Sequence, residues 1–143
     1  MSTDDADAFH LERFTDAQAG VYDMVLAELR AGTKRSHWIW FVFPQLRGLG
    51  RSSTAYRFGV VSVAEARAYL AHPVLGRRLE ECARLLLTHR DRTAREILGY
   101  PDDLKVRSSM TLFAHAGGGS VFTDVLDAFY GGEEDAATLE LLR

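Results

Sequence analysis

The sequence contains a single cysteine, Cys82, among its 143 residues. One thiol cannot form an intramolecular disulfide, and it cannot supply the thiol cluster of a structural metal site. Cys82 falls on an apolar helical stripe, where a free cysteine usually acts as a small hydrophobic side chain rather than as a nucleophile. The five histidines are scattered, and no two of them stand at the three- or four-residue spacing of helical metal ligands. The sequence therefore predicts no metal site.

Neither an excess of positive charge nor a long apolar run is present. Seventeen Lys and Arg residues stand against twenty Asp and Glu residues, and a general nucleic-acid binder usually carries a basic excess. No apolar run approaches the roughly 18 residues that span a bilayer, and the N-terminal MSTDDADAF is too acidic and polar for a signal peptide. We therefore expect a cytoplasmic protein with no nucleic-acid partner and no membrane partner.

What the sequence does contain is ordinary globular composition, with 47% hydrophobic and 26% charged residues. A chain of this length suits one domain and can bury roughly 70% of its unfolded surface. Residues 1–9 are predicted to be a disordered acidic N-terminus. Residues 10–143 are predicted to form a single helical domain, because no repeat, linker or clear pair of strands interrupts them.

Helical spacing recurs along this domain and predicts an all-α fold, a single compact domain of six to eight short helices around an aromatic core. Patterns of the capping-box type at residues 15–18, 62–65 and 93–96 indicate three helix starts. The clearest helix follows Pro73, since its apolar residues form one stripe: Leu75, Leu79, Cys82 and Leu86. Further helices are expected from Asp102 or Asp103 to about residue 116, over residues 120–130 and, for a turn or two, over residues 135–142.

The aromatic residues concentrate in one stretch, SHWIWFVFPQLRGLGRSS (residues 36–53). Trp38, Trp40, Phe41 and Phe43 stand together there before Pro44. Periodicity cannot distinguish a helix from a buried strand at this length, and we favour a helix from His37 to Phe43, capped by Ser36, because the other segments are helical. Trp38, Trp40 and Phe41 are expected to pack against the stripes of residues 75–86 and 122–129.

The loop of residues 45–53, called loop 45–53 below, has the features that anion binding requires. Gly48 and Gly50 let the backbone approach a ligand closely, and a helix that starts at Ser52 or Ser53 offers free N–H groups. The guanidinium groups of Arg47 and Arg51 can fork onto phosphate oxygens. The loop matches neither a Walker loop nor a dinucleotide-binding fingerprint, and we predict no cofactor. The alternative is a tight turn whose arginines lie in water.

A second polar feature lies on the helix over residues 103–115. Lys105, Ser108, Thr111 and His115 share one face of it. A lysine one turn from Ser108 and Ser109 resembles a minimal Ser–Lys pair for nucleophilic catalysis. The alternatives are a ligand-binding polar face and, as for most amphipathic helices, a face that is simply solvated.

Several segments carry a resemblance to one family: LERFTDAQ (11–18), KRSHWIWFVFPQLRGLGRS (34–52), EARAYLAHPVLGRRL (65–79), ILGYPDDLKVRSSMTLF (97–113) and VFTDVLDAFYGG near the C-terminus. On these motifs the chain is identified as a member of the bacterial domain-of-unknown-function family eighteen-ten (DUF family 1810). The resemblance implies a small, mostly helical fold and no established activity. The resemblance further implies a binding site at the positions that match the family: His37, Trp38, Trp40, Gln45, Gly48, Gly50, Ser52, Lys105, Ser108 and Ser109.

These features together predict a pocket where loop 45–53 meets the helical face of residues 105–115. It would bind a small phosphorylated ligand that is nucleotide- or ADP-ribose-like, through the family-like positions with Arg47 and Arg51 added. Arg47, Arg51 and Lys105 would neutralise the ligand's charge, the serines would donate hydrogen bonds, and a tryptophan would stack on a ring. Hydrolysis, with Asp102 or Asp103 as general base, extends this hypothesis.

The alternative function is a non-catalytic protein-interaction module. Tryptophans beneath a polar pocket favour a ligand, whereas tryptophans on a flat exposed patch favour a partner. A third interpretation is that both tryptophans belong only to the core. The sequence indicates no oligomeric state.

Overall fold

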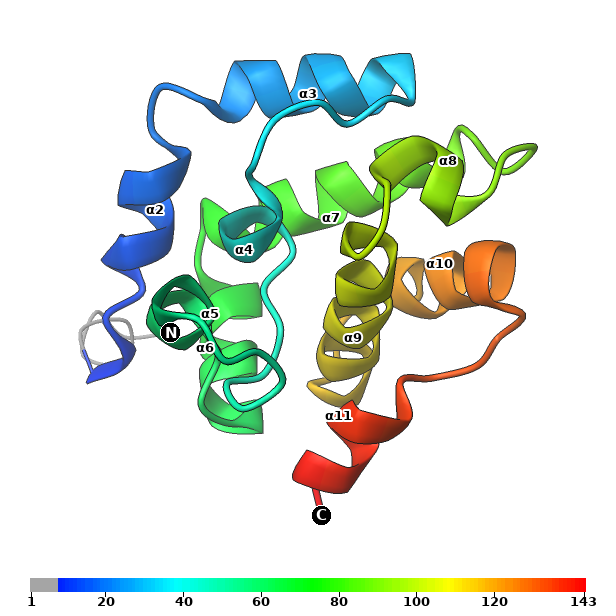
Figure 1. The fold of residues 1–143 in the computed structure, drawn as a ribbon. Helices are drawn as coiled ribbons and strands as arrows, with labels where there is room; N and C mark the ends of the chain where they lie inside the picture. The colour runs from blue at the N-terminus through cyan, green and yellow to red at the C-terminus, as the bar shows by residue number, and fades with distance from the viewer. Residues whose placement is uncertain (1–7) are drawn as a thin grey trace.

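The structure, a computed structural model, describes residues 8–143, which form the helices α2–α11 and no β-strand (Figure 1). The helices are α2 (Glu12–Gln18), α3 (Tyr22–Ala31), α4 (Ile39–Val42), α5 (Ser53–Phe58), α6 (Val63–Ala71), α7 (Leu75–Leu87), α8 (Ala94–Leu98), α9 (Asp102–His115), α10 (Val121–Tyr130) and α11 (Ala136–Leu141). The all-α prediction is confirmed, although these helices outnumber the six to eight expected.

One of the additional helices arises at the N-terminal end, where the capping box predicted at residues 15–18 is wrong. Thr15 lies inside α2 and its hydroxyl donates to the carbonyl of Glu12, while the Gln18 amide donates to the carbonyl of Phe41. Gly20 then adopts a φ of +78°, a left-handed conformation that ends the helical path before α3 begins. The pattern fails because both side chains find better-placed partners than the backbone N–H groups of a helix start.

The predicted start at Thr93 is confirmed in full. The Thr93 hydroxyl accepts from the N–H of Glu96, and the Glu96 carboxylate accepts from the N–H of Thr93. At residues 62–65 only half of the box forms, because Ser62 accepts from the N–H of Glu65 but the Glu65 carboxylate pairs with Arg13 at 2.7 Å. The helix start predicted at Ser62 is therefore confirmed, but the Glu65 carboxylate bonds to Arg13 of α2 and to the N–H of Val61 instead of the N–H of Ser62.

The N-terminal caps predicted for α4 and α9 are wrong. The Ser36 hydroxyl donates to the Glu28 carboxylate instead of accepting from a helix N–H, and α4 begins only at Ile39. Asp102 and Asp103 lie within the first turn of α9, after Pro101. The choice of helix over strand for the aromatic run is confirmed, and α4 lies at the centre of the molecule in contact with α2, α5, α7 and α9 (Figure 1).

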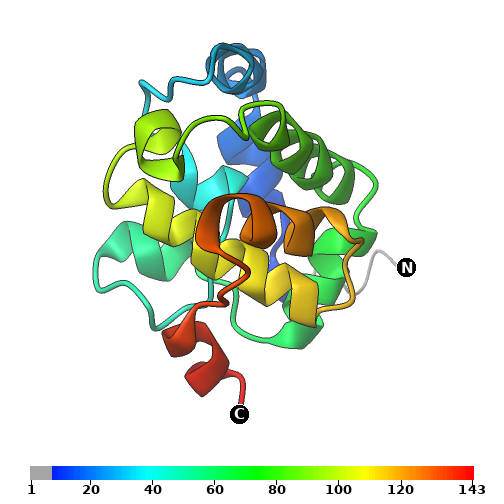
Figure 2. The ribbon, with the colours of Figure 1, turned by 90° about the vertical axis from the view of Figure 1, so that its right-hand side faces the viewer.

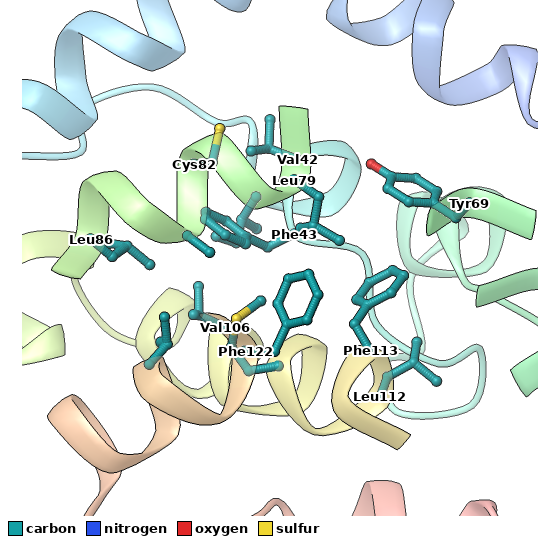
Figure 3. Close-up of a cluster of buried hydrophobic side chains, with 14 of the residues drawn as sticks. Val42, Phe43, Tyr69, Leu79, Cys82, Leu86, Val106, Leu112, Phe113 and Phe122 are labelled. Atoms are coloured by element: carbon teal, nitrogen blue, oxygen red, sulfur yellow. The ribbon is translucent and has the colours of Figure 1, made fainter. Parts of the chain in front are cut away.

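The core forms where α4, α6, α7, α9 and α10 meet (Figure 3). The stripe predicted on α7 is fully buried, and burial raises the pKa of the Cys82 thiol to about 12, so the thiol stays protonated. Aromatic rings connect the helices across the core, with Tyr69 5.1 Å from Phe14 and 5.3 Å from Phe113 between ring centroids. Trp38 lies in the core, whereas Trp40 and Phe41 are only partly buried.

The two ends of the chain differ in how they join this core. Residues 1–7, most of the N-terminus predicted to be disordered, lie outside the described residues, and Phe9 already packs against the core. At the other end, α11 packs against α9 at one end of the molecule (Figures 1 and 2). Across residues 8–143, no helix combines the length and the apolar character that crossing a membrane requires.

Candidate functional site

Loop 45–53 and α9 meet at a pocket of about 250 Å³. Five of the twelve residues proposed from the sequence line it, namely Trp40, Gln45, Gly50, Lys105 and Ser108. The other lining residues are Leu49, Pro101, Leu104, Asp135 and Ala137. We call this cavity the Lys105 pocket.

Two backbone hydrogen bonds at the base of loop 45–53 fix its shape. The N–H of Val60 donates to the carbonyl of Gln45 at 2.9 Å, and the N–H of Arg47 donates to the carbonyl of Val60 at 2.8 Å. Gly50 allows the loop to approach α5, since a Cβ there would lie 2.6 Å from the Cβ of Ala55. Gly48, at a φ of +108°, supplies the turn that only glycine adopts without strain.

Lys105 is the one cation of the described residues that lines the pocket. Its Nζ lies 3.6 Å from the centroid of the Trp40 ring, a cation–π contact, and 3.6 Å from Oδ1 of Asp102. Oδ2 of the same carboxylate pairs with Nζ of Lys34 at 2.6 Å, and the Lys34 side chain is only 5% exposed. One carboxylate therefore serves two ammonium groups, and the cluster keeps a net positive charge beside the cavity.

The two serines of α9 differ in position. Ser108 lines the pocket, and its hydroxyl donates to the carbonyl of Leu104 at 3.2 Å, one turn back in the helix. Ser109 is fully buried outside the pocket, and its hydroxyl has no hydrogen-bond partner among the described residues. No hydrogen bond in the described part of the chain joins Lys105 to either serine, so the geometry lacks the base contact that a Ser–Lys nucleophile requires.

The polar face of α9 beyond Ser108 forms hydrogen bonds and ion pairs with the segment that leads into α11, although His115 on that face stays exposed. Thr111 accepts a hydrogen bond from the N–H of Asp135 at 2.9 Å, and His115 pairs with Glu134. Arg107 donates to the carbonyl and the carboxylate of Glu133. This cover brings Asp135 and Ala137 to the pocket, although they lie some ninety positions after loop 45–53 in the sequence.

Neither arginine of loop 45–53 lines the Lys105 pocket, so the prediction that Arg47 and Arg51 act together with Lys105 on one ligand is wrong for this cavity. The guanidinium of Arg47 stacks on the ring of Tyr56, 4.0 Å from its centroid, and donates to the Tyr56 carbonyl at 2.9 Å. Arg51 is exposed and does not line the pocket. Ser52 caps α5 by accepting from the N–H of Ala55 at 3.0 Å, so its hydroxyl serves the helix.

Trp38 also lies away from the pocket, in a fully bonded environment. The ring is 1% exposed, and its Nε1 donates to the Glu28 carboxylate at 3.0 Å. That carboxylate also accepts from the N–H groups of Arg35 and Ser36 and from the Ser36 hydroxyl. Burial alone would raise the pKa of Glu28, but these four hydrogen bonds outweigh it and lower the pKa to about 2. His37, next to Trp38, is exposed and lines none of the pocket.

The predicted general bases are no better placed for chemistry on a ligand. Asp102 is held between two lysines, and neither Asp102 nor Asp103 lines the Lys105 pocket. Among the described residues, no group of three His, Cys, Asp or Glu side chains could hold a metal ion.

A larger groove of about 740 Å³ runs between α3 and α7. Most of its charged groups are already engaged, since Arg84 pairs with Glu80, the Tyr22 hydroxyl donates to Glu81 and Arg78 donates to the amide oxygen of Gln18. Arg78 stacks on Tyr22 as well, 4.3 Å from the ring centroid. The smaller Lys105 pocket is therefore the better candidate for a site.

Comparisons with known proteins identify relatives but no activity. The model of the family described as "Protein of unknown function (DUF1810)" matches residues 8–142. The crystal structure of the conserved hypothetical protein Rv1873 from Mycobacterium tuberculosis is similar to this chain, with a TM-score of 0.93 and 55% sequence identity. The match covers 94% of this chain and 97% of that one. The search of curated proteins returned no match.

Proposed function

This chain belongs to the DUF1810 family, as its motifs indicated, and we propose from the Lys105 pocket that it binds a small molecule through an anionic group of that molecule, between loop 45–53 and α9. The observation that carries the proposal is the position of the Lys105 ammonium. It lies over the Trp40 ring and shares its carboxylate, Asp102, with the more deeply buried Lys34. The single negative charge of Asp102 cannot neutralise both ammonium groups, so the positive charge of Lys105 at the wall of the cavity attracts an anionic group.

The polar groups around Lys105 support the same ligand class. Gln45 lines the cavity, and its amide N–H groups can donate hydrogen bonds to the oxygens of a phosphate or a carboxylate, whereas the Ser108 hydroxyl donates its proton to the carbonyl of Leu104. Trp40 and Leu49 provide an apolar wall for the rest of the molecule. A volume of about 250 Å³ suits a sugar phosphate or the phosphate end of a nucleotide, whereas a ligand as large as ADP-ribose would extend out of it.

Binding without chemistry is the form of the proposal that the geometry supports. Hydrolysis finds no support, because Asp102 is paired with lysines and Asp103 lies outside the pocket. An interaction module finds less support than a ligand site, since Trp38 is buried and Trp40 stands in the pocket wall beneath Lys105. We propose the cytoplasm as its location, which is compatible with the lone unpaired thiol of Cys82.

Thermal unfolding in the presence of ribose 5-phosphate, adenosine monophosphate and ADP-ribose tests the proposal. A ligand that binds only the folded chain raises Tm by several degrees at about 100 times its Kd. Lys105→Met keeps the aliphatic stem over Trp40 and removes the charge, so it should abolish the rise. Arg84→Met, which removes an exposed cation on α7 outside the Lys105 pocket, is the matched control and should keep the rise.

Two results would contradict the proposal. A rise in Tm that survives Lys105→Met would move the anion site elsewhere, and its loss in Arg51→Met alone would return the site to the arginines of loop 45–53. A flat response to the phosphates and to simple carboxylates, all at millimolar concentration, would favour the interaction module.

A further inference from the structure

A second charge of opposite sign lines the Lys105 pocket. Asp135 belongs to the lining, and its Oδ2 accepts hydrogen bonds from the N–H and the hydroxyl of Thr138 at 2.9 and 2.6 Å. No cation of residues 8–143 lies within 4.0 Å of the Asp135 carboxylate, and Lys105 pairs with Asp102 instead. The cavity therefore presents an ammonium and a carboxylate that are not paired with each other.

The two charges come from segments that the fold brings together for packing reasons. Lys105 lies on α9, and Asp135 precedes α11, which is held against α9 by the hydrogen bond from the Asp135 N–H to Thr111. The far end of α11 contacts loop 45–53, since a Cβ on Gly48 would lie 3.6 Å from Leu141 Cδ1. Residues of loop 45–53, of α9 and of the segment that begins α11 thus line one cavity. The loop and α11 lie toward the same end of the molecule (Figure 1).

A ligand with only negative charge would satisfy Lys105 and be repelled by Asp135. A ligand that carries both signs would satisfy both groups. Apart from Gln45, Gly50 and Ser108, the rest of the wall is apolar and is formed by Trp40, Leu49, Pro101, Leu104 and Ala137. Leu104 is 46% exposed, so this apolar surface continues to the rim.

We propose that the pocket binds a small zwitterion, namely an α-amino acid with an aliphatic side chain. Its carboxylate pairs with Lys105, its ammonium pairs with Asp135, and its side chain lies against Leu49, Leu104 and Trp40. This inference rests on the proposed function and names the ligand class for the same cavity.

The role of Asp135 as the N-cap of α11 does not account for its charge. Only Oδ2 takes part in capping, and asparagine caps helices as well as aspartate does. Asp135→Asn should therefore keep α11 in place and remove the negative charge alone. This substitution separates a structural role from a binding role.

Calorimetric titration of the full chain with three matched probes tests the inference. L-leucine carries both charges, N-acetyl-L-leucine carries only the carboxylate, and L-leucine methyl ester carries only the ammonium. The wild-type chain should bind leucine at least tenfold more tightly than either derivative. In Asp135→Asn the preference for leucine over N-acetyl-leucine should disappear, and in Lys105→Met the preference for leucine over its methyl ester should disappear.

The result that overturns the zwitterion differs from the result that overturns the pocket. Equal binding of leucine and N-acetyl-leucine by the wild-type chain, or binding of phosphates without binding of leucine, would reject the zwitterion and leave the anion site standing. A chain that binds none of the leucine probes and none of the phosphates loses both proposals. Circular dichroism and Tm should show that each variant is folded, and Arg84→Met should bind all three probes as the wild type does.

Discussion

The two tryptophans of the chain are separated by one residue, yet they lie in opposite kinds of environment. Beside Trp38, the Glu28 carboxylate accepts four hydrogen bonds, one from the indole N–H and three from the segment before it. The Trp40 ring lines a cavity, and the charges of Lys105 and Asp135, which line the same cavity, are not paired with each other. Two tryptophans of one aromatic run can therefore have different roles, one in stability and one in ligand binding. What distinguishes them is whether the polar groups beside each ring already have partners within the protein.

The largest expected effect on stability comes from truncating the tryptophans one at a time. Trp38→Ala should lower the free energy of unfolding by about 3–5 kcal/mol, because it empties a fully buried site and removes one of the four hydrogen bonds that the Glu28 carboxylate accepts. Trp40→Ala should cost about half as much, since that ring is only partly buried. Urea denaturation of both variants gives the two values, and equal losses would mean that the two environments do not differ in stability.

A smaller effect is expected from Glu28→Gln. The substitution removes charge-assisted hydrogen bonds to the segment before Trp38 and should cost about 1.5–3 kcal/mol at pH 7. The pKa of Glu28 is about 2 in the folded chain against 4.5 for an ordinary glutamate, so the unfolded chain takes up the proton first as the pH falls. The stabilisation by Glu28 is then present above pH 4.5 and is lost as the pH falls toward 2.

The pH dependence of stability distinguishes this role from simple packing. Urea denaturation at several pH values between 6 and 2.5 should show a steeper loss of stability on acidification for the wild type than for Glu28→Gln. Parallel curves for the two proteins would show that the carboxylate does not titrate as its hydrogen bonds require.

The smallest effect on stability should come from Lys105→Met, even though it removes the charge that the proposed ligand needs. Lys34 remains as the partner of Asp102, and an ion pair as long as 3.6 Å contributes about 0–1 kcal/mol. Urea denaturation should therefore place the variant within about 1 kcal/mol of the wild type. A loss above about 2 kcal/mol would assign Lys105 to the scaffold and weaken its role in binding.

Features that depend on neighbours in the sequence could be predicted, and those that depend on distant partners could not. The cap at Thr93 and the buried stripe on α7 follow from residues three or four positions apart, where one turn of helix fixes the geometry. The cap at Thr15 failed because the side chain of Gln18, three residues on, bonds to Phe41. Long-range bonds of this kind leave no trace in the local pattern.

The candidate site shows the same limit. The meeting of loop 45–53 with the helix of Lys105 was a hypothesis from polar and glycine-rich patterns, and the two elements do line one cavity. The direction of Arg47 could not be foreseen, since stacking on Tyr56 turns it away. Asp135 was missed because its place at the pocket depends on how α11 packs against α9, and it was recognised only as the start of a final turn.

The burial of Cys82 gives this chain its own reporter of conformational opening. The thiol is the only one in the sequence, is fully buried on the apolar stripe of α7 and stays protonated. A thiol reagent can therefore react only with molecules in which the packing around α7 has opened. The rate of labelling in native buffer then measures how often the molecule exposes its interior, without any engineered probe. Ligands of the Lys105 pocket should slow that labelling if the opening that exposes Cys82 also abolishes the pocket, and the rate then falls by the factor 1 + L/Kd, where L is the concentration of free ligand.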